Sequence, residues 1–332
     1  MKLMALIIDT FREIYAKKVV FGIIGIELMV IVITALIVFS DGQQRAYREA
    51  AQGAAIPTVA IDSARREAPF VVPNDTSLLG SDDATLDSLA GPGTSSRTFD
   101  TPAAPPAEVE GTVRGNPLAE MVKGQLAGLA GIIGAAVVFL GIFATAGIVP
   151  SMMEKGTVDL LLSKPLHRRT ILFGRALGGV LALAINLAGF VLVLWSIYGM
   201  ATGIWHLPFL IGTFSIPMFT FLVLYSAVIL LNVVTEGWVL PMSLVYIHMV
   251  ILGNFLRGRE ETLFTFISSE TLRGVIDGLY YLLPQTSDLL GSAVPASVYT
   301  GGVDTIAPFV QGGLFMLIML VLATWRFERR DF

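Results

Sequence analysis

The segment 151–170, SMMEKGTVDLLLSKPLHRRT, carries the residues best suited to chemistry, and that chemistry is recognition of a protein partner. It joins charged side chains to an apolar run, Val158 and Leu160–Leu162, and it lies between two long apolar stretches. A solvated loop has no use for these apolar side chains, which need a membrane surface or a protein groove to cover them. The pattern therefore predicts docking of a partner. The plainer alternative is a solvated loop that carries membrane-orienting positive charge.

Motifs of known catalytic chemistry are missing from the sequence. It contains no G-x-x-x-x-G-K-[ST] phosphate loop, no G-x-S-x-G and no H-E-x-x-H. The chain has no cysteine, which excludes thiolate metal sites and cysteine nucleophiles. Its three histidines are too scattered to form a recognisable metal motif. We therefore predict that the chain is not an enzyme and binds no metal, cofactor or nucleic acid.

The composition is that of a membrane protein. The chain has 332 residues, of which 54% are hydrophobic and 14% charged. Soluble domains are about 45–50% apolar and about 25% charged. A helix needs about 20 apolar residues to cross the hydrocarbon core. Six stretches qualify, namely Val19–Phe39, Leu126–Val149, Ile171–Tyr198, Phe209–Val234, Trp238–Leu256 and Ile306–Trp325.

The distribution of positive charge predicts the orientation. Of the 22 Lys and Arg residues, 12 fall before the first span, after the sixth, or between the end of the second span and Arg175 near the start of the third. The rule that cytoplasmic loops are positive places both termini and 151–170 in the cytoplasm. We expect residues 1–39 to form an interfacial helix and the first span, and 40–125 an extracytoplasmic loop or small domain. Residues 126–332 then form the main membrane domain around the segment 151–170.

The sequence indicates where two helices begin or end on the outer side of the membrane. The loop 40–125 is acidic and rich in small residues and Pro, but Asn116-Pro117 near its end is typical of a helix cap followed by proline at the first helical position. The second span's helix should begin there. An amphipathic helical pattern also runs from Ser269 to Pro284. It predicts an outer helix that lies on the membrane surface or re-enters it.

Four polar residues fall inside or close to the predicted spans: Glu27, Arg175, Asn186 and His248. An ionised carboxylate within a span costs about 2.5–3.5 kcal/mol on insertion scales, so Glu27 should face protein or water. It is either a substrate-path or proton-linked residue or, the reading we favour, a structural partner, with Arg175 as a candidate. Asn186 and His248 are better interpreted as hydrogen-bonding groups between helices than as ligands.

A known signature becomes recognisable within 151–170. The residues are Glu154-Lys155-Gly156-Thr157, Leu160-Leu161-Leu162-Ser163-Lys164-Pro165 and Arg168-Arg169. They resemble the pattern E-x-G-T…L-L-x-x-P…R of type-2 ABC transporter permeases, especially the branch with the nitrous-oxide-reductase maturation permease. Asn116-Pro117-Leu118, Leu282-Leu283-Pro284 and the end 327–331 agree with that resemblance.

The resemblance implies an all-α membrane protein of six transmembrane helices. It adds an N-terminal interfacial helix, a cytoplasmic coupling helix and outer re-entrant or amphipathic helices. Such a subunit pairs with an ABC ATPase, which carries ATP and Mg, and with a second permease subunit in the bacterial cytoplasmic membrane. Coupling to the ATPase would fall to Glu154, Lys155, Gly156, Thr157, Leu160, Leu161, Pro165 and Arg168. The long first outer loop departs from the family's usual pattern, so no substrate is carried over.

Three functions compete at this point. The first is the permease subunit of an ABC exporter. The second is a membrane anchor or assembly factor that uses a partner ATPase mechanically on an envelope protein held by the outer loop. The third is a secondary transporter, which the few buried charges and the absence of a detectable internal repeat disfavour.

Overall fold

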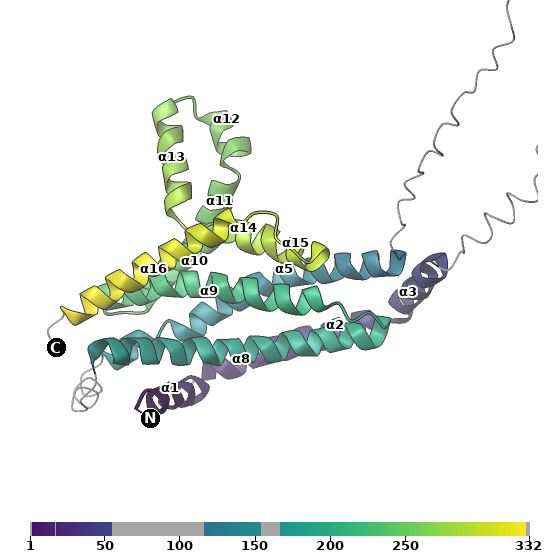
Figure 1. Cartoon of the computed structure of the whole chain (residues 1–332), viewed down its shortest axis with the longest axis horizontal. Coiled ribbons are helices and arrows are strands. Elements are labelled where there is room, and N and C mark those ends of the chain that lie inside the picture. The colour runs from purple at the N-terminus through teal and green to yellow at the C-terminus, as the bar shows by residue number, and fades with distance from the viewer. Residues whose placement is uncertain (1, 17, 55–115, 154–166, 330–332) are drawn as a thin grey trace, which may run out of the picture. The chain divides into compact units, whose positions relative to one another are not determined.

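The computed structural model describes residues 2–16, 18–54, 116–153 and 167–329, and every regular element among them is a helix (Figure 1). The helices are α1 (Lys2–Ala16), α2 (Lys18–Val38), α3 (Asp41–Ala54), α5 (Pro117–Thr145), α6 (Ile148–Met152), α8 (Arg168–Thr202), α9 (Leu207–Thr235), α10 (Val239–Ile247), η2 (His248–Leu252), α11 (Gly253–Arg257), η3 (Arg259–Leu263), α12 (Phe264–Phe266), α13 (Glu270–Leu282), α14 (Thr286–Asp288), η4 (Leu289–Ala293), α15 (Val294–Thr300) and α16 (Ala307–Glu328). The three η elements are π-helical turns.

The chain divides into two compact units. One comprises Met1–Tyr47 and Ala119–Phe332, and the other comprises Arg48–Leu118. Most of the second unit lies outside the described residues. The helices discussed below belong to the first unit unless stated otherwise.

Six of the described helical stretches are long and apolar enough to cross a membrane, which confirms the predicted number of spans. They are α2, α5 with α6, α8, α9, α10 through α11, and α16. The fourth and fifth spans are separate, as their short connector predicts. Helix α9 ends at Thr235 and is capped by Glu236, whose φ of 58° is left-handed and whose amide donates to the carbonyl of Asn232 at 2.9 Å.

Helix α9 lies at the centre of the first unit. It packs against α8, α10, α15 and α16, and its Phe209, Phe221 and Tyr225 are fully buried. Helix α5 also approaches it closely, since a Cβ atom on Gly134 would lie 3.0 Å from the Cγ of Pro217. By contrast, α2 and α16 keep many large apolar side chains exposed. Those faces suit contact with lipid or with another membrane helix.

The helix predicted after Ser269 is present as α13, and it ends before Pro284. Figure 1 shows α12 and α13 as a hairpin that stands away from α8 and α9. Polar contacts hold this hairpin together, because Arg259 Nε donates to Asp277 Oδ1 at 2.6 Å and Arg273 Nε donates to the carbonyl of Ile267 at 2.7 Å.

Residues 41–54, at the start of the segment predicted as a loop or small domain, form helix α3. Their sequence, DGQQRAYREAAQGA, is rich in strong helix formers, and Asp41 lies in the first turn, where an acidic residue complements the helix dipole. Within the second unit, α5 begins at Pro117 as predicted. The side-chain oxygen of Asn116 accepts a hydrogen bond from the amide of Leu118 at 3.1 Å, which is the expected cap.

Candidate functional site

Most coupling residues implied by the resemblance lie outside the described residues. These are Glu154, Lys155, Gly156, Thr157, Leu160, Leu161 and Pro165. Arg168 is described as the first residue of α8. Because α6 precedes the segment 154–166 and α8 follows it, the structure describes both flanks.

Glu13 of α1 contacts both flanks of that segment. Its Oε1 accepts a hydrogen bond from the Ser151 hydroxyl of α6 at 2.9 Å. Its Oε2 accepts one from Nη1 of Arg175 on α8. Asp9, one turn earlier on α1, lies 3.7 Å from Nη2 of the same arginine. The Arg175 side chain is only 6% exposed, so water screens this ion pair weakly.

Two adjacent glycines of α8 allow α1 and α6 to come this close. A Cβ atom on Gly178 would lie 2.7 Å from the Cβ of Thr10 on α1. A Cβ atom on Gly179 would lie 2.7 Å from the Cδ1 of Ile148 on α6. Carbon atoms in contact are about 3.5–4.0 Å apart, so any larger residue would displace one of these helices. Small residues at helix crossings serve this purpose in membrane proteins generally.

A second ion pair joins the start of α8 to the end of α16. Arg169 donates from Nε and Nη2 to the two carboxylate oxygens of Glu328, the latter at 2.9 Å. Both side chains are exposed to solvent to a considerable degree, so the pair adds little stability. Its two parallel hydrogen bonds do fix how the two helix ends face each other.

Glu27 pairs with Asn186, and the expected pairing with Arg175 is wrong. Asn186 Nδ2 on α8 donates to Glu27 Oε2 on α2 at 3.0 Å. Arg175 precedes Asn186 by 11 positions, which places it about 16 Å away along the helix. It is also held by the carboxylates of α1. His248 makes a different contact between elements, from its Nε2 to the carbonyl of Pro284 at 3.0 Å.

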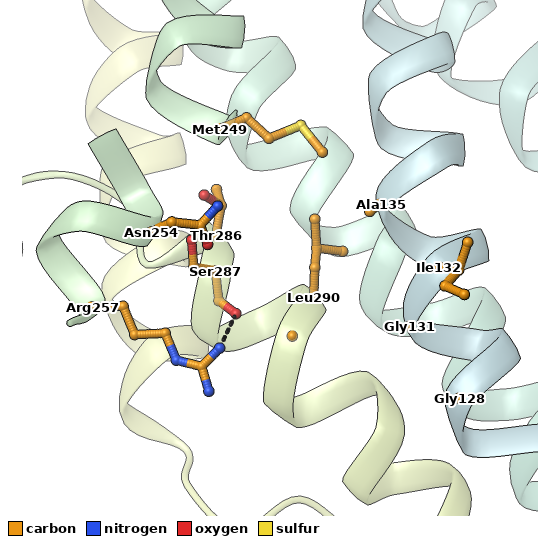
Figure 2. Close-up of a pocket in the computed structure, with 11 residues that line it drawn as sticks. Gly128, Gly131, Ile132, Ala135, Met249, Asn254, Arg257, Thr286, Ser287 and Leu290 are labelled. Carbon is orange, nitrogen blue, oxygen red and sulfur yellow. Dashed lines mark hydrogen bonds between the residues drawn. The ribbon is translucent and has the colours of Figure 1, made fainter. Parts of the chain in front are cut away.

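A cavity of about 310 Å³ lies between α5, the η2–α11 part of the fifth span, and the α14–η4 segment (Figure 2). Its lining residues are Gly128, Gly131, Ile132 and Ala135 of α5, Met249 of η2, Asn254 and Arg257 of α11, Thr286 and Ser287 of α14, and Leu290 and Gly291 of η4. Figure 2 shows the small and apolar residues of α5 on one side and the polar residues on the other. Two π-helical turns contribute to the lining, and such turns are frequent at functional sites.

Two hydroxyl groups in this cavity, those of Thr286 and Ser287, are buried and have no hydrogen-bond partner. Leaving such a group unpaired costs about 1–3 kcal/mol. The adjacent Arg257 is neutralised by Asp288, whose Oδ1 lies 3.1 Å from its Nε, and its Nη1 donates to the backbone oxygen of Ser287 at 3.4 Å (Figure 2). Because both hydroxyl oxygens are buried, a ligand in the cavity would meet mainly its apolar residues and the neutralised Arg257, so the cavity suits an uncharged, partly apolar ligand.

A larger cavity, of about 440 Å³, lies beside the α12–α13 hairpin, and Arg259, which lines it, is already paired with Glu260 and Asp277. The Arg259 guanidinium lies 3.8 Å from the ring centroid of Tyr280 and bonds Asp277. Burial, together with the hydrogen bond to Asp288, raises the pKa of Tyr280 to about 12. This cluster holds the hairpin in place. Among the described residues, no group of three or more His, Asp and Glu side chains could hold a metal ion.

Comparison with known proteins decides the family. The family described as "ABC-2 family transporter protein" matches residues 4–332, which is nearly the whole chain. The chain belongs to the ABC-2 transporter family. As an ABC-2 protein it is a multi-pass membrane permease subunit of an ABC transporter, a type of assembly whose ATPase is a separate partner. Comparison with curated proteins gave no match.

Sequence reasoning missed several residues that the ABC-2 fold brings together. Glu13 is indistinguishable in sequence from any residue on the polar face of an amphipathic helix. Ser151 opens the recognised segment but is not part of its signature. Thr286 and Ser287 follow Pro284 in a region that shows no periodic pattern. Only the approach of distant helices makes these residues neighbours, so no local pattern identifies them.

Proposed function

We propose that this chain is the membrane subunit of an ABC exporter that couples ATP hydrolysis on a separate ATPase to movement of a substrate across the bacterial cytoplasmic membrane. The match of residues 4–332 to the ABC-2 family carries this proposal. The chain would act with a second permease subunit, identical or related. ATP and Mg would bind to the ATPase, because this chain has no phosphate-binding loop.

The segment 154–165 is the proposed docking element. Leu160 and Leu161 would fill an apolar groove of the ATPase, while Glu154 and Arg168 would set orientation at the polar rim. The flanks support this role, since both are bonded to Glu13 of α1: Ser151 of α6 donates a hydrogen bond to its carboxylate, and Arg175 of α8 forms an ion pair with it.

The number of spans links docking to topology. With six spans, both termini lie on one side of the membrane. The segment between the second and third spans lies on that same side. Because the ATPase is cytoplasmic, docking at 154–165 would place both termini in the cytoplasm as well.

The cavity of Figure 2 is the proposed place of ligand contact within the described residues. Its position between the second and fifth spans would let a movement of those spans open or close it. Its neutralised arginine and the apolar residues of its lining favour an uncharged, partly apolar substrate.

Co-purification with the ATPase tests the proposal. Leu161→Asp should reduce the recovered ATPase at least tenfold, because it buries an unpaired charge at the interface. Glu154→Ala should leave the complex assembled but lower its ATPase rate. The matched control is Leu272→Asp on the exposed face of α13, which should leave assembly unchanged. Equal recovery from Leu161→Asp and wild type would refute docking at this segment.

Export itself is tested by comparing the molecules released by cells with and without the chain. Loss of a released small molecule in the deletion strain, restored by the wild-type chain, is the expected result. An assembled, ATP-hydrolysing complex that changes no released molecule would instead favour the mechanical assembly factor.

A further inference from the structure

We propose that Glu13 is a positioning residue for energy coupling: it joins the two flanks of the docking segment to helix α1, so that a movement of the segment is passed on to α1. The inference rests on the proposed function. It adds a residue that lies far from the recognised signature and on a different helix.

The geometry singles out one carboxylate shared by three helices. Glu13 Oε1 accepts from Ser151, which lies 138 positions away on α6, at 2.9 Å. Glu13 Oε2 accepts from Arg175, which lies 162 positions away on α8. Each oxygen thus serves a different flank of the segment 154–166. A displacement of either flank relative to α1 must break a hydrogen bond, and one of these bonds is charge-assisted.

The neighbouring acidic residue of α1 cannot do the same. Asp9 approaches Arg175 only to 3.7 Å, its side chain is 68% exposed, and the Ser151 hydroxyl donates to Glu13 and to the carbonyl of Ile148 rather than to Asp9. The Glu13 side chain is 27% exposed. Asp9 is therefore a matched control of the same charge, on the same helix and beside the same arginine.

Attachment of α1 to α8 does not depend on Glu13 alone. Thr10 of α1 is fully buried against Gly178, and Leu6 is 7% exposed. Removal of the Glu13 carboxylate should leave this contact in place. What the variant loses is the link from α1 to α6 and the nearer of two carboxylates that face Arg175. Stability should fall, but Asp9, 3.7 Å from the guanidinium, and the Thr10–Gly178 contact should keep α1 in place while coupling fails.

Spin labels can follow α1 without knowledge of the substrate, because the chain contains no cysteine. Cysteines at Met4 on α1 and Leu317 on α16 are suitable, since these side chains are 62% and 58% exposed. The distance between the labels is measured by pulsed electron paramagnetic resonance in the complex with the ATPase. Measurements are made without nucleotide and after trapping with ATP and vanadate.

The wild type should show a shift of that distance on trapping. Glu13→Ala should lose most of the shift while the complex stays assembled and hydrolyses ATP. Glu13→Gln, which still accepts hydrogen bonds but carries no charge, should keep part of it. Asp9→Ala should behave as wild type.

A shift in Glu13→Ala equal to that of wild type would overturn the inference. So would an active wild-type complex in which α1 does not move. A wild-type chain that binds no ATPase would overturn the proposed function itself, which separates the two failures.

Discussion

The crossing of α1 and α8 at Gly178 gives a quantitative test of how the docking region is assembled. In Gly178→Ala the new Cβ would lie 2.7 Å from the Cβ of Thr10 and 2.9 Å from its Cγ2. Carbon contacts of about 3.5–4.0 Å are normal, so α1 must move by roughly 1 Å. Overpacking of this kind costs about 1–3 kcal/mol. Alanine also gains about 0.5–1 kcal/mol over glycine in a helix, which offsets part of that cost.

Gly189→Ala on the same helix is the matched control, because nothing lies within 4 Å of its Cβ position. The gain in helix propensity is the same for both variants and cancels in their difference. We therefore expect Gly178→Ala to be less stable than Gly189→Ala by about 1–3 kcal/mol, the steric cost alone.

Two measurements apply to this pair. The free energy of unfolding is obtained by titration of the protein from a mild detergent into a denaturing one. Displacement of α1 is followed by the rate at which a thiol reagent labels Thr10→Cys, since the native side chain is fully buried. Labelling should accelerate in the Gly178→Ala background and not in the Gly189→Ala background. Equal stability and equal labelling in the two backgrounds would refute the close packing of α1 on α8.

Two further predictions concern the membrane interior and the cavity. Glu27→Gln should unfold at nearly the wild-type denaturant concentration, whereas Glu27→Leu should lose about 1 kcal/mol, because it leaves the amide of Asn186 unpaired. Wild-type stability of the leucine variant would show that the pair is dispensable. Gly253→Ala would place a Cβ atom 2.9 Å from the Ser287 hydroxyl beside the cavity. Gly253→Ala should lower the ATPase rate of the complex without preventing its assembly. The control is Gly258→Ala, whose Cβ position has its nearest neighbour at 3.5 Å, and it should keep the wild-type ATPase rate. Equal ATPase rates in the two variants would argue against ligand contact in the cavity.

The parts of the fold that follow from local sequence were predictable. Apolar runs gave the six spans, and an amphipathic period bounded by Ser269 and Pro284 gave α13. The Asn116-Pro117 pair gave the start of α5. Each of these signals acts within a few residues of the structure it specifies, because caps, proline and helical periodicity are local effects.

Pairings between distant residues were not predictable in the same way. Glu27 needed a polar partner in any arrangement, and the sequence offered both Arg175 and Asn186 on the same predicted span. Arg175 and Asn186 lie at different levels along α8. Which of them meets Glu27 depends on how far α2 is shifted along the axis of α8, and the sequence does not give that shift. Helix α3 was not predicted for another reason. Residues 40–125 were interpreted as one segment by their overall composition, and the proline-rich later part hid the helix-forming residues at its start.

The contacts around the proposed docking segment also explain why its sequence signature does not include the residues that attach it to α1. A docking segment can move its own permease only if its two ends are attached to the helices that must respond. Gly178 and Gly179 bring α1 and α6 onto neighbouring positions of α8. The buried Arg175 then needs a carboxylate, since an unpaired buried cation is costly. Glu13 supplies it and has one oxygen left for Ser151. Among the described residues, charge balance thus places the link between the proposed docking segment and α1 on Glu13, which bonds both flanks.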